Sequence, residues 1–295
     1  MIEGKTCLIT GSTSGIGKQI AIGLAKLKAN VVLVGRKKAR CEALLEEIRR
    51  NISTDSSKNR ISYLLADLSS QASIRQLADE FLANHERLDV LLNNAGVFLP
   101  KRLTTIDGIE YTFAVNHLAP FLITNLLFER IKASSPSRII TTSSVAHRGA
   151  HINFDDLQLE RRRYNGLKAY SQSKLANILF TKELSRRSKG SGVTSNCFHP
   201  GAVRTNLIQS GPWYYRLIWA TVRPFLVSPW RGADTAIYLA SSSDVEGISG
   251  KYFVRRKEVG LSDSADDQDA AIRLWKISEE LTGIKNNRID NKSNR

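Results

Sequence analysis

Short apolar segments alternate with longer amphipathic ones along most of this chain, and the alternation limits the folds that it can adopt. The apolar, strand-like runs cover residues 5–10, 31–34, 61–65, 88–92, 138–142 and 193–198. Segments with helical periodicity lie between them, over residues 18–28, 38–50, 70–85, 106–131 and 164–187, with Ser70 as the predicted N-cap of the third. Strands that alternate with helices of this length form βαβ units and a parallel sheet. We therefore predict an α/β fold, doubly wound, with helices on both faces of the sheet.

No linker and no internal repeat divides this pattern, so we predict one domain over residues 1–283. The remaining residues, 284–295, are polar and are expected to form a disordered tail. Residues 211–227 are rich in aromatic and basic side chains, but the stretch is too short and too charged to span a bilayer comfortably. It could belong to a lid over an apolar pocket, at about residues 202–230, and touch a membrane surface. It could equally be a helix packed on the core or on a partner subunit.

The composition of the 295-residue chain excludes several classes of protein. Its three scattered cysteines form no Cys-x-x-Cys pair, which argues against a disulfide framework and suits a reducing compartment. His147 and His151 have helical spacing, but Gly149 lies between them and no acidic partner is near, so no metal site is expected. We see no secretory signal and no apolar stretch of about 18 residues, which predicts a cytoplasmic or peripherally membrane-associated protein.

The formal net charge of +15 favours anionic partners without identifying one. On charge alone, a solvated basic surface, an anionic membrane, an anionic cofactor and nucleic acid all stay open. Basic residues do not alternate with aromatic ones, and the densest basic cluster, residues 161–163, is short. We therefore expect no nucleic-acid partner.

A glycine-rich turn joins the first predicted strand to the first predicted helix, where a dinucleotide pyrophosphate would lie. Glycines let the backbone approach phosphates, and the helix N-terminus supplies oriented N–H groups. The residues expected to hold the cofactor there are Gly11, Ser12, Thr13, Ser14, Gly15, Ile16 and Gly17. The second strand ends with Arg36 and Lys37 and without the carboxylate that would bind a ribose 2′-hydroxyl. Basic side chains suit a 2′-phosphate, so the sequence predicts that NADP(H) is preferred over NAD(H).

Further candidate residues follow the ends of the other predicted strands. Because the carboxyl ends of parallel strands meet at one edge, where open α/β sheets bind ligands, these residues should lie close together. They are Asp67 and Leu68 after the third strand, Asn94, Ala95 and Gly96 after the fourth, Ser144 after the fifth, and Pro200, Gly201, Val203 and Thr205 after the sixth. Asn116 lies within the next predicted helix, where its helix propensity does not favour it. Each could be an ordinary turn or surface residue alone, but together they favour a binding site.

Tyr170 and Lys174 are four residues apart in a predicted helix and therefore share one face. A nearby ammonium favours the phenolate, so Lys174 should lower the tyrosine pKa from its usual value of about 10. Tyr170 would then be a usable acid and base. Such a pair also arises by chance on exposed helix faces, and the other motifs are what favour the chemical interpretation.

Together, these motifs resemble those of the short-chain dehydrogenase/reductase family over residues 4–282. Residues 10–17 are similar to its T-G-x-x-x-G-x-G, residues 93–96 to its N-N-A-G and residues 170–174 to its Y-x-x-x-K. We therefore predict one Rossmann-type domain with a mostly parallel, seven-stranded sheet in the order 3-2-1-4-5-6-7. The resemblance implies that Tyr170 is the general acid/base and that Lys174 lowers its pKa and binds the nicotinamide ribose. It also implies that Ser144 holds the substrate oxygen and that Asn116 supports a proton relay through water.

A narrower resemblance, to the retinol dehydrogenase group, rests on residues 143–147, 170–180 and 199–201 and on the C-terminal half with Trp275. It implies an NADP(H)-dependent oxidoreductase of small lipophilic carbonyls or alcohols, retinal- or retinol-like. Many members of that group carry an N-terminal hydrophobic anchor, whereas this sequence starts at the first strand; the anchor is either absent or outside it. The alternatives are a broad reductase of aldehydes, ketones or steroids, and an NADP(H)-binding sensor or scaffold without useful turnover. Peripheral membrane contact and a homodimer are compatible with each.

Overall fold

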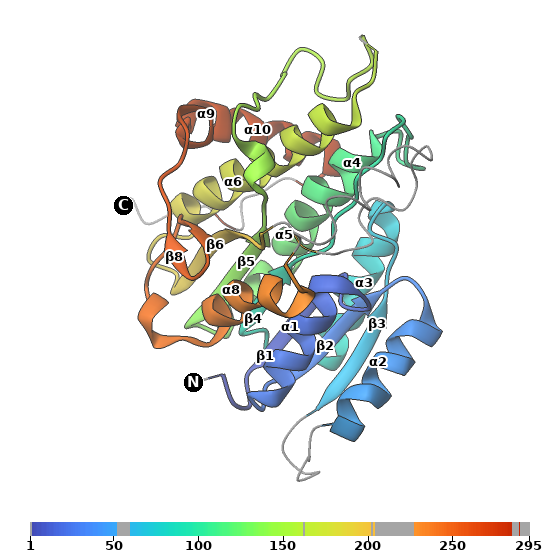
Figure 1. Ribbon diagram of the computed structural model, residues 1–295, viewed down its shortest axis with the longest axis vertical. Helices are drawn as coiled ribbons and strands as arrows, with labels where there is room; N and C mark the ends of the chain where they lie inside the picture. Colours follow the sequence, from blue (N-terminus) through green and yellow to red (C-terminus); the bar gives the residue numbers. More distant parts are fainter. Residues whose placement is uncertain are drawn as a thin grey trace.

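The core of the fold is one parallel sheet with a short antiparallel edge. The computed structural model describes residues 2–51, 60–161, 163–201, 203, 227–284 and 289. Within these residues the sheet has eight strands in the order β3-β2-β1-β4-β5-β6-β7-β8 (Figure 1). Their bounds are β1 (Thr6–Thr10), β2 (Asn30–Gly35), β3 (Ile61–Leu65), β4 (Val90–Asn93), β5 (Ser137–Thr142), β6 (Val193–His199), β7 (Tyr252–Val254) and β8 (Lys257–Glu258). The first seven are parallel in the predicted order, and β8 pairs antiparallel with β7. The fold prediction is therefore confirmed, with one additional strand.

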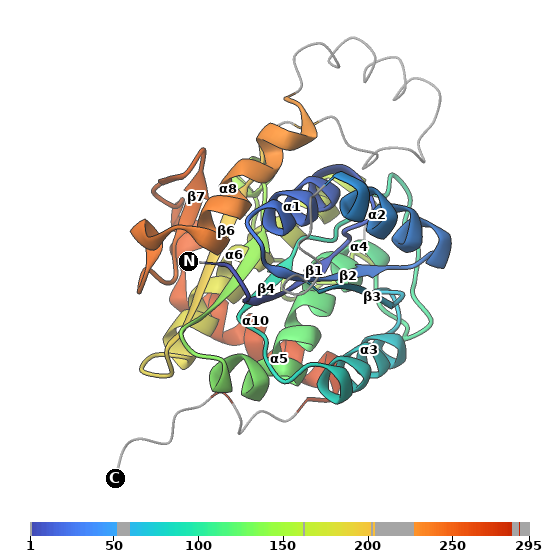
Figure 2. The ribbon, with the colours of Figure 1, turned by 90° about the horizontal axis from the view of Figure 1, so that it is seen from below.

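Helices cover both faces of the sheet (Figure 2). On one face lie α1 (Gly15–Lys26), α2 (Lys38–Asn51) and α8 (Pro229–Ser241), and on the other α3 (Gln71–Asn84), α5 (Ala119–Ala133) and α6 (Gly166–Arg187). The C-terminal helix α10 (Gln268–Thr282) packs against α6. The shorter elements are α4 (Tyr111–Phe113), the π-helical turn η1 (Ala114–Leu118), the 3-10 turns η2 (Val145–His147) and η5 (Ser243–Val245), and α9 (Asp263–Asp266).

The central strands are buried on both faces, which is why they read as continuous apolar runs. Leu8 and Leu91 belong to the core under α3 and α5, whereas their neighbours Ile9 and Leu92 belong to the core under α1 and α8. Side chains along a strand point alternately to the two faces, so a sheet between two layers of helices needs apolar residues at every position. At α3, the predicted N-cap is confirmed, because the Ser70 hydroxyl accepts a hydrogen bond from a backbone N–H of the first turn.

Two predicted helices begin at least two residues later in the structure than predicted, whereas the helix predicted from residue 18 begins earlier, at Gly15. The helix predicted from residue 106 begins at Tyr111, because the Glu110 carboxylate caps it by accepting from the N–H groups of Thr112 and Phe113. The helix is also not regular, since η1 interrupts it before α5 begins. The helix predicted from residue 164 begins two residues later, where the Asn165 side chain caps α6.

The predicted lid and tail fall mainly outside the described residues. Of the lid at about residues 202–230, the structure describes Val203, which forms an isolated bridge with Val227, and the start of α8. The aromatic stretch at residues 211–227 lies outside the description except at its last residue. At the C-terminus, α10 ends at Thr282, and the following Gly283 has a φ of 63°, in the left-handed region that favours glycine.

Candidate active site

The glycine turn between β1 and α1 forms a cradle that larger residues would fill. Gly11 has a φ of 65°, and a Cβ there would lie 2.9 Å from the Ala95 Cα. A Cβ on Gly17 would lie 2.2 Å from the Gly11 carbonyl oxygen. Ser14 is the N-cap residue of α1, but its side chain accepts no hydrogen bond from the first turn. The first backbone N–H groups of the helix can therefore donate to another acceptor. The turn therefore fits the phosphate groups of a dinucleotide.

The end of β2 lies against this turn. A Cβ on Gly35 would be 2.6 Å from the Thr13 Cγ2 atom, so the two segments are in close contact. The next residue, Arg36, is exposed, and its guanidinium lies 3.5 Å from the hydroxyl of Tyr111 at the start of α4. Lys37 is exposed as well. The structure thus brings both basic residues to the side of the glycine turn.

The segments that follow β3 and β4 complete this side of the site. Asp67 is exposed and accepts a hydrogen bond from the Ser69 hydroxyl, whereas Leu68 is buried. Asn94 is tied to β1: its backbone N–H donates to the Thr10 hydroxyl over 2.9 Å, and its side chain donates to the Thr10 carbonyl over 3.0 Å. These bonds hold residues 94–96 beside the glycine turn.

Asn116 connects three segments of the site from within η1. Its side-chain oxygen accepts from the Val97 N–H over 2.7 Å, and its amide group donates to the Val97 carbonyl over 2.9 Å and to the Ser173 hydroxyl over 3.0 Å. A Cβ on Gly96 would lie 3.4 Å from both the Asn116 oxygen and the Lys174 ammonium. The π-helical turn therefore places Asn116 between the β4 loop and α6, at the Lys174 side chain.

Tyr170 and Ser144 meet between α6 and the end of β5. Burial raises the pKa of Tyr170 to about 12, and a hydrogen bond with the Ser144 side chain acts in the opposite direction. The Ser144 hydroxyl oxygen also accepts from the Ala146 N–H and so begins η2. The ring of Phe98 meets the Tyr170 ring edge-on, with centroids 5.9 Å apart. The tyrosine hydroxyl is thus held beside a second hydroxyl in an apolar wall.

Lys174 is 2% exposed, and its ammonium donates to the Thr142 carbonyl oxygen over 3.1 Å. It lies over the face of the Tyr170 ring, 5.5 Å from the centroid. Burial lowers the pKa of Lys174 to about 8. The pKa of Tyr170 is raised and not lowered as the spacing predicts, because the loss of hydration on burial is the largest influence on it. The catalytic roles of these two residues stay predictions.

The segment after β6 lies close to the glycine turn and to α8. Gly201 has a φ of 87°, and a Cβ there would lie 3.2 Å from Val227. A Cβ on Gly232 in α8 would lie 2.6 Å from a methyl group of Val203 and 3.3 Å from Ile16. Val203 and Ile16 therefore both lie next to Gly232 of α8, and Pro200 lies three residues before Val203 in the chain. Thr205 lies outside the described residues.

Three residues of this site were not predicted from the sequence. Val97 holds Asn116 through its backbone, and Thr142 holds Lys174 through its carbonyl oxygen. Because both act through backbone atoms, their side chains carry no signal. Phe98 could be found only from its place two residues after the Asn-Asn-Ala-Gly segment.

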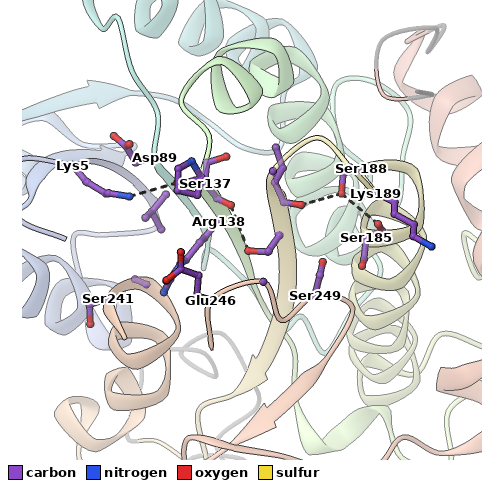
Figure 3. A pocket seen from close by; sticks show the side chains of 18 of the residues that line it. Lys5, Asp89, Ser137, Arg138, Ser185, Ser188, Lys189, Ser241, Glu246 and Ser249 are labelled. Carbon is purple, nitrogen blue, oxygen red and sulfur yellow. Dashed lines mark hydrogen bonds between the residues drawn. The ribbon is translucent and has the colours of Figure 1, made fainter. Parts of the chain in front are cut away.

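A separate hollow of about 780 Å³ lies at the opposite edge of the sheet, where the strands begin (Figure 3). Its lining includes neither Tyr170 nor Lys174. Two charged side chains that face it are bonded within the protein: Asp89 accepts from the Thr6 N–H, and Arg138 donates to two carbonyl oxygens at the end of α8. We therefore do not regard this hollow as the substrate site.

The part of the chain that the structure describes contains neither a metal-ligand cluster nor a membrane-spanning helix. No cluster of three or more His, Cys, Asp or Glu side chains there could hold a metal ion. Within the same ranges, no helix combines the length and the apolar character needed to cross a membrane.

A doubly wound sheet with a glycine turn at the first strand defines the dinucleotide-binding class of α/β proteins. The family model for short chain dehydrogenases matches residues 5–212, and the chain belongs to this family. It is therefore an oxidoreductase that acts on CH–OH groups with a nicotinamide cofactor.

Relatives of known name match almost the whole chain. Retinol dehydrogenase 13 of Homo sapiens is 43% identical over 96% of this chain and 86% of its own length. Retinol dehydrogenase 14 of Mus musculus is 44% identical over 96% of this chain and 87% of its own length. Among solved structures, an uncharacterized protein from Mycobacterium paratuberculosis has a TM-score of 0.76 and 33% identity, covering 96% of this chain and 94% of its own. An active-site complex of Pseudomonas aeruginosa RhlG with NADP has a TM-score of 0.66 and 25% identity, covering 85% and 94%.

Proposed function

We propose that this protein is an NADP(H)-dependent oxidoreductase of lipophilic carbonyls and alcohols, with retinal- or retinol-like molecules as favoured substrates. The observation that carries the proposal is the convergence of Tyr170, Ser144, Lys174 and Asn116 at one end of the sheet, beside the glycine cradle. Relatives named retinol dehydrogenases, with 43% and 44% identity over 96% of the chain, support the substrate class.

Four residues of the site each have a different role in the proposed transfer of hydride and proton. A bound nicotinamide supplies the hydride for carbonyl reduction and accepts it in the reverse reaction. Tyr170 donates its proton to the carbonyl oxygen, and the Ser144 hydroxyl donates a hydrogen bond where negative charge develops. The Lys174 ammonium lies within the same site and offsets that charge. Asn116 holds the β4 loop against α6 and supports the path by which Tyr170 regains its proton.

The proposed preference for NADP(H) rests on charge at the end of β2. Arg36 and Lys37 are both exposed beside the glycine turn, and no carboxylate lies next to them in the sequence. A guanidinium can bind a phosphate group in a bidentate manner, whereas a ribose 2′-hydroxyl is usually held by Asp or Glu. The NADP complex of the similar Pseudomonas aeruginosa protein supports the same choice.

Apolar side chains around the site support a lipophilic substrate. Val145 follows Ser144 directly and is 47% exposed. Leu167 lies one turn before Tyr170 on α6 and is 62% exposed. Phe98 contacts the Tyr170 ring. These side chains neighbour Ser144 and Tyr170 in the chain, on α6 or in space, and a hydrocarbon substrate would find apolar surface there.

The proposal extends to the organisation of the chain. Residues 1–283 would form the catalytic domain, residues 202–230 its lid and residues 284–295 a polar tail. The net charge of +15 favours peripheral contact with anionic membranes. Co-sedimentation with anionic and neutral vesicles tests this contact, and equal binding to both would contradict it.

The substrate class can be tested by NADPH oxidation at 340 nm with all-trans-retinal, decanal and a steroid ketone. Retinal turnover well above the other two is the expected result. Equal turnover of all three would replace the retinoid assignment with a broad carbonyl reductase. No turnover of any, with NADPH still bound, would favour a sensor or scaffold.

A further inference from the structure

The buried imidazole of His147 holds the turn that begins at Ser144. This turn, η2, follows β5 and is a single 3-10 turn of three residues. Val145 is 47% exposed and Ala146 is partly buried, whereas His147 is 1% exposed. One isolated turn gains little from its own backbone hydrogen bonds, because so short a helix has no cooperativity. Within η2, His147 is therefore the residue that fixes the turn to the core.

His147 donates to the Ser144 carbonyl oxygen twice. Its backbone N–H donates over 3.1 Å, and its side-chain Nδ1 atom lies 2.6 Å from the same oxygen. A carbonyl oxygen can only accept a hydrogen bond, so Nδ1 must carry a proton. Burial lowers the pKa of His147 from its ordinary value of 6.5, so the ring is neutral at pH 7. Its single proton is then on Nδ1 and not on Nε2.

The ring of His147 is anchored to the sheet at β7. It meets the Tyr252 ring edge-on, with centroids 5.0 Å apart and an angle of 76° between the planes. Tyr252 is 2% exposed and belongs to the strand that pairs with β6. Edge-to-face contact is a preferred arrangement of two rings. It fixes the imidazole relative to the sheet, and the hydrogen bond from Nδ1 carries this constraint to the backbone of Ser144.

Ser143 fixes the same turn from its other side. Its backbone N–H donates to the Phe198 carbonyl oxygen over 2.8 Å, and its hydroxyl donates to the Lys174 carbonyl oxygen over 2.8 Å. The hydroxyl of Ser143 is thus used within the protein. Ser144 is consequently held from both sides, by Ser143 before it and by His147 after it.

The closed turn leaves the proton of the Ser144 hydroxyl for an acceptor outside it. The hydroxyl oxygen accepts from the Ala146 N–H over 3.2 Å, which fixes the direction of the side chain. An N–H group cannot accept in return, so the hydroxyl proton can point elsewhere. This is what the proposed contact with a substrate oxygen requires. The Ala146 N–H reaches the hydroxyl oxygen only while the turn is closed.

We propose that His147 is a positioning residue for Ser144. Its Nδ1–H group holds the Ser144 carbonyl, and the closed turn then aims the Ser144 hydroxyl at the substrate oxygen. The effect on turnover rests on the proposed function, in which Ser144 donates to that oxygen, whereas the hydrogen bond from Nδ1 does not. The two can be tested separately.

The hydrogen bond is tested by NMR on the full chain without substrate. Labelling with ¹⁵N-histidine gives signals from five imidazoles, and the signal missing in His147→Asn belongs to His147. We expect a neutral ring protonated on Nδ1 at pH 7. A neutral ring protonated on Nε2 would overturn the proposal, whatever the substrate of the enzyme is.

Two substitutions separate the hydrogen bond from the packing of the ring. His147→Phe keeps a ring against Tyr252 and removes the donor, whereas His147→Asn keeps a donor near the position of Nδ1 and removes the ring. With NADPH and all-trans-retinal, kcat should fall about tenfold to a hundredfold in His147→Phe, as when a reacting group is slightly misplaced. KM should change less than about threefold, because the Ser144 hydroxyl acts on charge that develops in the transition state.

The order of the two variants distinguishes positioning from a merely structural role. His147→Asn should recover most of the lost kcat, although its Tm should be the lower of the two because the ring contact is gone. If kcat followed Tm and were lowest in His147→Asn, the positioning role would be refuted. His151→Phe is the matched control: His151 is exposed, its ring contacts Ser264 in α9, and the variant should keep kcat within about twofold.

A double-mutant cycle with Ser144→Ala tests the route of the effect, in single turnovers with enzyme in excess. If His147 acts through the Ser144 hydroxyl, His147→Phe should slow the reaction by less than about twofold once that hydroxyl is absent. A full further loss in the double variant would refute positioning through Ser144. Undiminished turnover in Ser144→Ala alone would instead refute the proposed role of Ser144 in the reaction, and the NMR result would stand independently.

Discussion

Gly17→Ala tests whether the glycine turn is built to leave room for a cofactor. Gly17 lies in the first turn of α1, where alanine would normally be the better residue by about 0.5–1 kcal/mol. The structure reverses this preference. An added Cβ would lie 2.2 Å from the Gly11 carbonyl oxygen and 2.5 Å from the Asn94 side-chain nitrogen, well inside the ~3.5 Å at which heavy atoms touch.

The expected size of the effect follows from these two contributions. Overpacking against a rigid neighbour costs about 1–3 kcal/mol, and the clash involves a backbone carbonyl that cannot rotate away. Subtracting the helical preference leaves a net loss of about 1–2 kcal/mol in the free energy of unfolding. For a domain of this size that is a decrease in Tm of about 2–8 °C. Because the same clash displaces the turn, NADPH affinity should fall by about tenfold.

Thermal unfolding and fluorescence titration with NADPH measure the two effects, with Gly260→Ala as the control. Gly260 is exposed, and an added Cβ there meets no atom within 4 Å. Its substitution should change stability by less than about 0.5 kcal/mol. If Gly17→Ala behaved like Gly260→Ala in both measurements, the steric account of the turn would be refuted.

The remaining predictions concern charge and pH. Arg36→Asp should lower the NADP/NAD ratio of kcat/KM by about tenfold or more, because a carboxylate repels a 2′-phosphate and binds a 2′-hydroxyl. Arg50→Asp, at the far end of α2, is the control and should leave this ratio unchanged. An unchanged ratio in both variants would count against the preference for NADP(H). Burial lowers the pKa of His117 to about 3, so as pH falls the unfolded chain, with its ordinary value of 6.5, binds the proton first. Stability is therefore complete above pH 6.5 and decreases by about 2 kcal/mol between pH 7 and pH 5 from this residue alone. Urea unfolding at the two pH values should show this loss in the unsubstituted protein but not in His117→Phe, and equal losses would disprove a buried neutral imidazole.

Much of the sheet could be predicted because its strands are buried on both faces and therefore apolar throughout. The strand β8 could not, since its two residues, Lys257 and Glu258, are exposed and show no pattern. The π-helical turn was also beyond sequence reasoning. Apolar periodicity over residues 106–131 does not distinguish a regular helix from one with a single wider turn, and the carboxylate cap of Glu110 has no apolar signature.

The members of the candidate site could be predicted, but their electrostatics could not. Spacing puts Tyr170 and Lys174 on one face of a helix, yet it does not reveal that the ammonium bonds to the Thr142 carbonyl and lies over the tyrosine ring. Burial, which depends on the whole fold, then raises the pKa of the tyrosine.

Tyr170→Phe removes the hydroxyl to which we assign the proton transfer and leaves the ring against Phe98 in place. NADPH oxidation at 340 nm with all-trans-retinal measures turnover, and fluorescence titration measures NADPH binding by the same preparation. We predict that turnover is lost in this variant while NADPH binds with unchanged affinity. Retained turnover in Tyr170→Phe would contradict the assignment of this tyrosine as the acid and base.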